Sequence, residues 1–132
     1  MSLRLAVYGL LLDGVGPSAA PRLRDSCRLL GGALLPGALL DLGPYPGLVP
    51  APGTVRGELW ELLDARVLAE VDRYEGYDPR RPDASAYVRR EIRLVRPAMD
   101  AWAYLYVGPR DGLPRVPGGD WRTHAARRLR GR

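Results

Sequence analysis

The stretch Asp72-Arg73-Tyr74-Glu75-Gly76-Tyr77 decides how the middle of this 132-residue chain folds. The apolar residues upstream of it are Leu59, Trp60, Leu62, Val67, Leu68 and Val71. Their spacing predicts a strand followed by an amphipathic helix, which Asp64 is placed to cap and Gly76 to end. Glu75 then lies at the end of a buried element, flanked by tyrosines that shield it from water. Because an apolar site raises the pKa of a carboxyl group toward neutral pH, we interpret Glu75 as a candidate for proton transfer.

The N-terminal part of the chain predicts two strands, a helix and an ordered loop. A short apolar run over residues 4–8 predicts the first strand. We expect a helix over 21–30 that ends at a pair of glycines, and then a strand over 33–42 that is bulged or bent at Pro36. Residues 43–52 are rich in proline and glycine, so we expect them to form an ordered loop.

The C-terminal part predicts three further strands and a tail. Residues 54–62 form the strand that precedes the helix. The alternation of apolar and polar residues predicts strands over 86–95 and 101–107, which pair in antiparallel fashion. We therefore expect one domain over residues 1–108, followed by a Pro-, Gly- and Arg-rich tail over 109–132 that can pack on it.

The composition limits the partners and the compartment. The formal net charge is +5, but the chain has no Lys, Phe, Asn or Gln, which indicates a GC-rich coding bias and a bacterial source. The Arg excess is then weak evidence for a nucleic-acid partner, and we expect none. Cys27 is the single cysteine, so no disulfide forms within the chain and we expect a cytoplasmic protein. No apolar segment approaches the roughly 20 residues that span a bilayer, so no membrane partner is expected.

Several motifs favour structural interpretations over chemical ones. The stretch Gly14-x-Gly16-x-x-Ala19 formally matches a dinucleotide-binding fingerprint, but the regular alternation of strands and helices is missing. His124 has no partner at metal-ligand spacing, so we expect a surface residue and no metal site. Trp102, Tyr104 and Tyr106 share one strand face, which we assign to the core. No serine lies in a Gly-x-Ser-x-Gly elbow, so serine chemistry is not expected.

Asp72 and Glu75 are three residues apart and therefore share one face of the predicted helix. They form either an acid and base pair or a solvent-facing pair that Arg66 or Arg73 neutralises. The residues alone leave this choice open.

The order of the motifs is more specific than any one of them. They are Tyr8-Gly9-x-Leu11-x-x-Gly14, Gly43-x-Tyr45-Pro46-Gly47-Leu48, Val55-x-Gly57-Glu58-Leu59, Val71-Asp72-x-x-Glu75-Gly76 and Tyr87-x-Arg89. This series resembles the γ-glutamylcyclotransferase-like family, which includes the γ-glutamylamine cyclotransferases and the AIG2-like, avirulence-induced proteins of plants. The resemblance spans residues 4–107, and Gly119-Asp120-Trp121 is similar to a tail motif of some members.

The resemblance implies a fold and a set of site residues. The fold is α+β, a small mixed and partly closed β-barrel flanked by helices. The catalytic glutamate of the family matches Glu75. The γ-glutamyl group is expected to lie against the backbone of Tyr8, Gly9, Leu10 and Leu11, with Tyr45 and Tyr87 as walls of the pocket. Many members have Ser or Thr where this chain has Leu10, which leaves open whether a hydroxyl is needed there.

The implied reaction needs neither a cofactor nor a metal, because the substrate supplies its own nucleophile. The α-amine of a γ-glutamyl compound attacks the γ-carbonyl and closes a five-membered ring, giving 5-oxoproline and a free amine or amino acid. Intramolecular attack in a fixed geometry has an effective molarity of roughly 10⁵ M or more, and a positioned base adds about 10²- to 10⁴-fold. The alternative is a catalytically inactive or accessory protein that binds γ-glutamyl ligands on the same scaffold. The leaving amine and the oligomeric state are not readable from the sequence.

Overall fold

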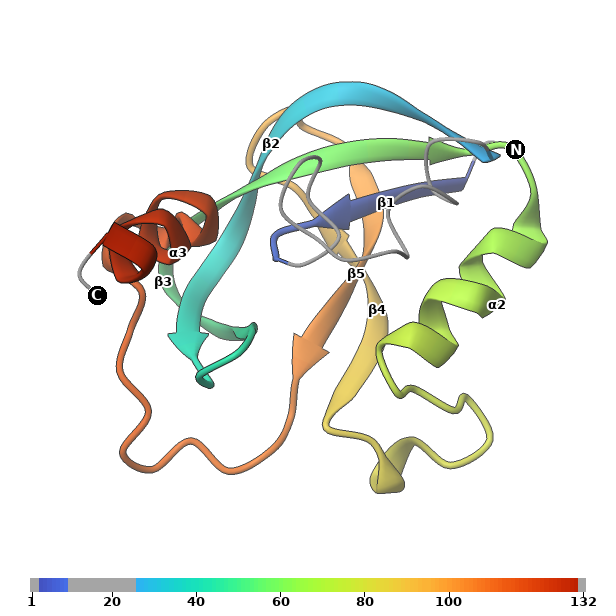
Figure 1. Cartoon of the computed structure of the whole chain (residues 1–132). Helices are drawn as coiled ribbons and strands as arrows, with labels where there is room; N and C mark the ends of the chain where they lie inside the picture. The colour runs from blue at the N-terminus through green and yellow to red at the C-terminus, as the bar shows by residue number, and fades with distance from the viewer. Residues whose placement is uncertain (1–2, 10–25, 131–132) are drawn as a thin grey trace.

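The computed structural model describes residues 3–9 and 26–130 (Figure 1). Its strands are β1 (Leu3–Val7), β2 (Cys27–Asp41), β3 (Pro46–Leu62), β4 (Tyr87–Arg93) and β5 (Asp100–Tyr106), and its helices are α2 (Ala65–Tyr74) and α3 (Trp121–Arg130). The strands form one mixed sheet in the order β2-β3-β1-β5-β4, in which only β1 and β5 run parallel. The α+β class is therefore confirmed. The sheet is open, so the partly closed barrel is not confirmed.

Strand β2 corrects the end of the helix expected over residues 21–30, whereas Ser26 is helical as predicted. Residues 27–30 belong to β2, where Leu29 pairs with Trp60 of β3, and residues 21–25 lie outside the described part of the chain. The glycine pair does not end a helix. Gly31 instead lies at a β-bulge, where its φ of +138° is accessible to glycine.

Strand β3 begins earlier than the sequence predicts. The expected loop over 43–52 is wrong from Pro46 onward, because Pro46 opens β3 opposite Asp41. A proline is tolerated at the first residue of a strand. Residues 50–53 contain Pro50 and Pro52 and have no partner in the register with β2. The N–H groups that these prolines lack are therefore not needed for strand pairing. The bend expected near Pro36 is confirmed, since the register shifts between Pro36 and Ala38.

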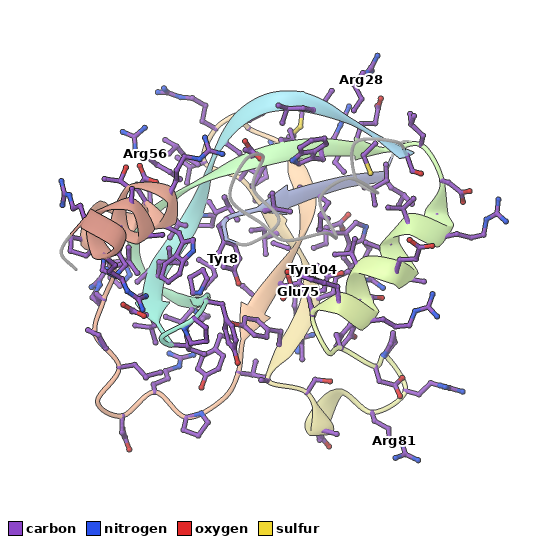
Figure 2. The ribbon with its side chains drawn as sticks, in the orientation of Figure 1. Tyr8, Arg28, Arg56, Glu75, Arg81 and Tyr104 are labelled. Atoms are coloured by element: carbon purple, nitrogen blue, oxygen red, sulfur yellow. The ribbon has the colours of Figure 1, made fainter. Side chains whose placement is uncertain are left out.

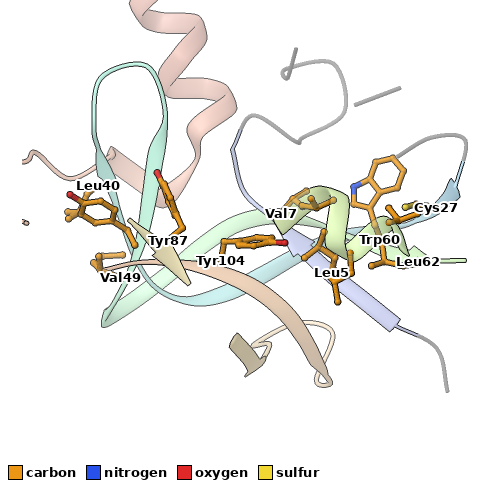
Figure 3. Packing of buried hydrophobic residues seen from close by; sticks show 14 residues of the cluster. Leu5, Val7, Cys27, Leu40, Val49, Trp60, Leu62, Tyr87 and Tyr104 are labelled. Atoms are coloured by element: carbon orange, nitrogen blue, oxygen red, sulfur yellow. The ribbon is translucent and has the colours of Figure 1, made fainter. Parts of the chain in front are cut away.

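Two clusters of buried apolar side chains hold the sheet and the helices together. One cluster joins β1 and β5 to the apolar face of α2, and it includes Val71, Tyr104 and Tyr106 (Figure 3). Tyr104 and Tyr106 are buried as expected, and Trp102 packs on the same cluster while partly exposed. The other cluster contains Trp121 at the start of α3, which is 2% exposed.

The segment before α3 runs along the edge of β2. The N–H of Asp41 donates to the carbonyl of Pro114, and the N–H of Val116 donates to the carbonyl of Leu39, both at 2.8 Å. The expectation of a surface His124 is wrong, because its ring is half-buried and its Nε2 lies 2.8 Å from Oδ2 of Asp41. Within the described ranges, neither α2 nor α3 is long and apolar enough to cross a membrane.

Candidate active site

The C-terminal end of α2 fixes the position of Glu75. Asp64 caps the start of the helix and accepts a 2.9 Å bond from the N–H of Arg66. At the other end the N–H of Gly76 donates to Arg73 and the N–H of Tyr77 donates to Asp72, at 3.1 and 2.8 Å. This is a Schellman motif, and it requires a left-handed residue, which Gly76 provides with a φ of +72°. Glu75 is thus the C-cap residue, as its place in the sequence predicts.

The side chain of Glu75 lines a cavity of about 430 Å³. Such a volume falls in the range of small-molecule sites. The cavity lies between the end of α2 and strands β1, β4 and β5, and its lining residues are Ala6, Val7, Tyr8, Gly9, Tyr45, Pro46, Tyr74, Glu75, Gly76, Ala86, Tyr87 and Tyr104. Figure 2 shows Tyr8, Glu75 and Tyr104 directed into the interior, whereas Arg28, Arg56 and Arg81 project from the periphery.

The cavity brings together most of the residues that the sequence singled out. Glu75, Tyr8, Gly9, Tyr45 and Tyr87 all line it, although they come from four separate segments of the chain. The predicted backbone contacts at residues 10 and 11 lie outside the described residues. Tyr74, one of the tyrosines expected to shield Glu75, also lines the cavity, whereas sequence reasoning missed Tyr104 because it was assigned to the core.

Burial in this cavity raises the pKa of Glu75 to about 7 from an ordinary value of 4.5. Among residues 3–9 and 26–130, no cation and no hydrogen-bond donor contacts its carboxyl group. The C-terminal end of a helix also carries partial negative charge, which disfavours an ionised carboxylate further. Glu75 is therefore able to exchange a proton near neutral pH.

Asp72 is buried and paired, so the interpretation of a solvent-facing pair that Arg66 or Arg73 neutralises is wrong. It is 5% exposed, and its Oδ1 accepts from Nε of Arg89 at 2.8 Å and from the hydroxyl of Tyr104 at 2.6 Å. Arg66 pairs instead with Asp64 at the start of the helix. Asp72 and Glu75 are thus unequal, one held as an ion pair and the other without a counter-ion among the described residues.

Hydrogen bonds fix the tyrosines around Glu75. The hydroxyl of Tyr8 donates to the carbonyl of Tyr104 at 2.7 Å and accepts from the N–H of Leu48 at 3.2 Å. The hydroxyl of Tyr87 donates to the carbonyl of Pro46 at 2.6 Å. Burial, together with the nearby charge of Glu75, raises the pKa of Tyr8 and of Tyr87, so both stay protonated.

Two further contacts shape the mouth of the cavity. The rings of Tyr45 and Tyr87 meet edge to face with centroids 6.3 Å apart. A Cβ added to Gly9 would lie 2.7 Å from Cγ of Pro46, so a glycine lets the end of β1 approach β3 here. Across the described ranges, no group of three or more His, Cys, Asp or Glu side chains is arranged to hold a metal ion.

Comparisons with known proteins show the family of the chain. Residues 5–123 match the family model described as gamma-glutamyl cyclotransferase, AIG2-like. The gamma-glutamylcyclotransferase family protein YtfP of Escherichia coli is 37% identical over 120 residues, which cover 90% of this chain and 96% of YtfP. The solution structure of E. coli ytfP matches with a TM-score of 0.68 and 35% identity over 90% of this chain and 96% of that one. The crystal structure of an uncharacterized protein from Pyrococcus horikoshii has a TM-score of 0.75 at 22% identity, with 98% of both chains covered.

Proposed function

Since the chain belongs to the gamma-glutamyl cyclotransferase, AIG2-like family, we propose that it is an enzyme that cyclises a γ-glutamyl group to 5-oxoproline. The other product is the amine or amino acid attached to the γ-carbonyl. The observation that carries this proposal is the Glu75 carboxyl, which has no counter-ion among the described residues and faces a cavity of about 430 Å³.

Glu75 is the base in the proposed reaction. Its carboxylate removes one proton from the α-ammonium of the substrate, and the nitrogen lone pair attacks the γ-carbonyl carbon. The C–N bond that forms closes the five-membered ring and leaves negative charge on the former carbonyl oxygen. When the tetrahedral intermediate collapses, the bond to the leaving amine breaks, and Glu75 returns its proton to that amine. The ring nitrogen, which carries two protons after the attack, passes one of them to the departing amine through Glu75, so the products are 5-oxoproline and an ammonium. A pKa of about 7 suits both transfers, because the group must accept and then donate.

The other requirements are a folded substrate and donors for the oxyanion. A cavity walled by Tyr8, Tyr45 and Tyr87 limits the conformations of a short flexible chain, which favours intramolecular attack. We assign the oxyanion to backbone N–H groups of the glycine loop that the sequence predicts after the first strand, in line with the expected contact of this loop with the γ-glutamyl group.

The test is the formation of 5-oxoproline from a panel of γ-glutamyl amino acids, γ-glutamyl amines and glutathione, followed by mass spectrometry. The wild type is compared with Glu75→Gln and with Glu91→Gln, an exposed glutamate on β4 that serves as the control for loss of one charge. We expect product from the wild type and Glu91→Gln and a loss of about 10²-fold or more in Glu75→Gln. A folded Glu75→Gln variant with full activity would contradict the role of Glu75.

The accessory-protein alternative gives a different result in the same samples. A γ-glutamyl ligand would then raise the melting temperature of wild-type protein, while no 5-oxoproline would form from any compound of the panel. Stabilisation together with product supports the enzyme.

A further inference from the structure

Three tyrosine hydroxyls around Glu75 each donate their proton to a group that can only accept a hydrogen bond. Tyr8 donates to the carbonyl of Tyr104 at 2.7 Å, and Tyr87 donates to the carbonyl of Pro46 at 2.6 Å. Tyr104 donates to the carboxylate of Asp72 at 2.6 Å. A tyrosine hydroxyl has a single proton, so each of these oxygens has only lone pairs left for other partners. Because each hydroxyl uses its proton in these bonds, the three tyrosines can act toward a ligand only as acceptors.

The ion pair behind Tyr104 keeps that tyrosine an acceptor. Arg89 donates to both oxygens of Asp72, at 2.8 and 3.2 Å, and its guanidinium lies 4.6 Å from the ring centre of Trp102. The two side chains of the pair are 7% and 17% exposed. A buried ion pair is weak evidence for stability, because its desolvation offsets its attraction. Its geometric effect is definite: Asp72 accepts from Arg89 and from the hydroxyl of Tyr104, so the proton of Tyr104 lies on the side of Asp72.

The cavity is negatively charged, and the lone pairs of the tyrosine oxygens add to its negative potential. In the lining that the structure describes, Glu75 is the single charged side chain, and no Arg, Lys or His contributes. Glu75 and the three tyrosines line the same cavity, and burial first and the charge of Glu75 second raise the pKa of Tyr8 and Tyr87. Such an arrangement attracts a cationic donor and repels an anion.

We propose that the hydroxyl oxygens of Tyr87 and Tyr104 hold the α-ammonium of the substrate beside Glu75, and that Asp72 and Arg89 are positioning residues which fix Tyr104 as an acceptor. This rests on the proposed function. An ammonium has three N–H donors, which two tyrosine oxygens and one carboxylate satisfy. Glu75 removes one of the three protons before the attack, and the other two hold the nitrogen in place until the ring closes and one of them is lost. The hydroxyl of Tyr8 has less capacity to accept a further hydrogen bond, since it already accepts one from the N–H of Leu48.

The test compares two ligands that differ in the ammonium alone. L-glutamine carries the α-ammonium, and glutaramate is the same chain without it. Affinities are measured by titration calorimetry for the wild type and for Tyr87→Phe, with 5-oxoproline quantified in every sample. Tyr106→Phe is the matched control, because Tyr106 also donates to a proline carbonyl, that of Pro109 at 2.7 Å, and lies outside the cavity lining.

We expect the wild type and Tyr106→Phe to bind L-glutamine at least about tenfold more tightly than glutaramate, as a charge-assisted hydrogen bond predicts. The preference falls in Tyr87→Phe. It also falls in Asp72→Asn, which removes the carboxylate that pairs with Arg89 and fixes the hydroxyl of Tyr104. Tyr87→Phe keeps the ion pair, so it remains informative if Asp72→Asn does not fold.

Equal affinities for the two ligands, including binding of neither, would overturn the proposal. So would a preference that Tyr87→Phe leaves unchanged. The result separates this proposal from the proposed function. If the protein prefers L-glutamine but forms no 5-oxoproline from any γ-glutamyl compound, the ammonium site is supported and the enzymatic function is contradicted. If 5-oxoproline forms but L-glutamine is not preferred, the enzymatic function is supported and the ammonium site is contradicted.

Discussion

Replacing Glu75 by Gln is expected to stabilise the protein at neutral and alkaline pH, even though it removes the proposed base. Burial raises the pKa of Glu75 from 4.5 to about 7, so the folded state holds the proton more tightly than the unfolded state does. The free energy of unfolding therefore falls as the pH rises from 4.5 to about 7 and is then constant. At about 1.4 kcal/mol per pKa unit, the ionised carboxylate costs about 3 kcal/mol above pH 7. Glutamine carries no such cost.

The assay is urea denaturation of the wild type and Glu75→Gln at several pH values from 4 to 9. The two proteins should be equally stable near pH 4 and should separate by about 3 kcal/mol at pH 8, or roughly 10 °C in melting temperature. Glu91→Gln, which removes an exposed carboxylate, should follow the wild type. A difference between wild type and Glu75→Gln that does not change with pH would refute the argument, because it would mean that Glu75 ionises equally easily in both states.

Three further predictions concern the parts of the fold that support the site, and each is measured by chemical denaturation. Gly76→Ala should lower the free energy of unfolding by about 1 kcal/mol, since Gly76 has a φ of +72° and a Cβ there would meet no atom; an unchanged stability would argue against the left-handed cap. Trp121→Ala should cost about 3–5 kcal/mol, because Trp121 is 2% exposed; a change below 1 kcal/mol would mean that α3 is not part of the core. Although burial raises the pKa of Asp41, hydrogen bonds from His124 and the N–H of Gly43 lower it overall, so Asp41→Asn should cost about 1–2 kcal/mol at pH 7 and less as the pH falls below 3.8. A cost that is the same at pH 3 and pH 7 would contradict that hydrogen-bonded pairing.

The sequence correctly predicted the helices and strands whose local residue pattern matches their surroundings in the fold. The helix that ends at Glu75 has an N-cap in Asp64, an apolar stripe and a left-handed glycine, and all three are found in the structure. The paired strands over 86–95 and 101–107 are likewise confirmed as β4 and β5, because period-two alternation marks a strand with one exposed face.

The errors arose where pairing between distant segments overrides local preference. Leu29 and Leu30 precede two glycines and resemble the end of a helix, yet they form a strand because β3 provides a partner. Proline normally argues against a strand, but at Pro46 it occupies the first position, where it breaks no pair.

The candidate site was predictable as a set of residues, whereas its electrostatics were not. The order of motifs singled out Glu75, Tyr8 and Tyr87, which do line one cavity. That Asp72 is neutralised by Arg89, 17 residues away, depends on how β4 packs against α2. Only this contact shows that Asp72 is paired with a cation while Glu75, on the same helix face, has no counter-ion among the described residues.

The most direct test of the central claim is the pH dependence of kcat/KM for 5-oxoproline formation, measured on the best substrate of the panel. Because Glu75 must be ionised to accept a proton, we predict that kcat/KM rises with pH and levels off above about 7, and that Glu75→Gln loses the activity across the range. A profile that has already levelled off near pH 5, or a folded Glu75→Gln variant that forms 5-oxoproline at the wild-type rate, would contradict the assignment of Glu75 as the base.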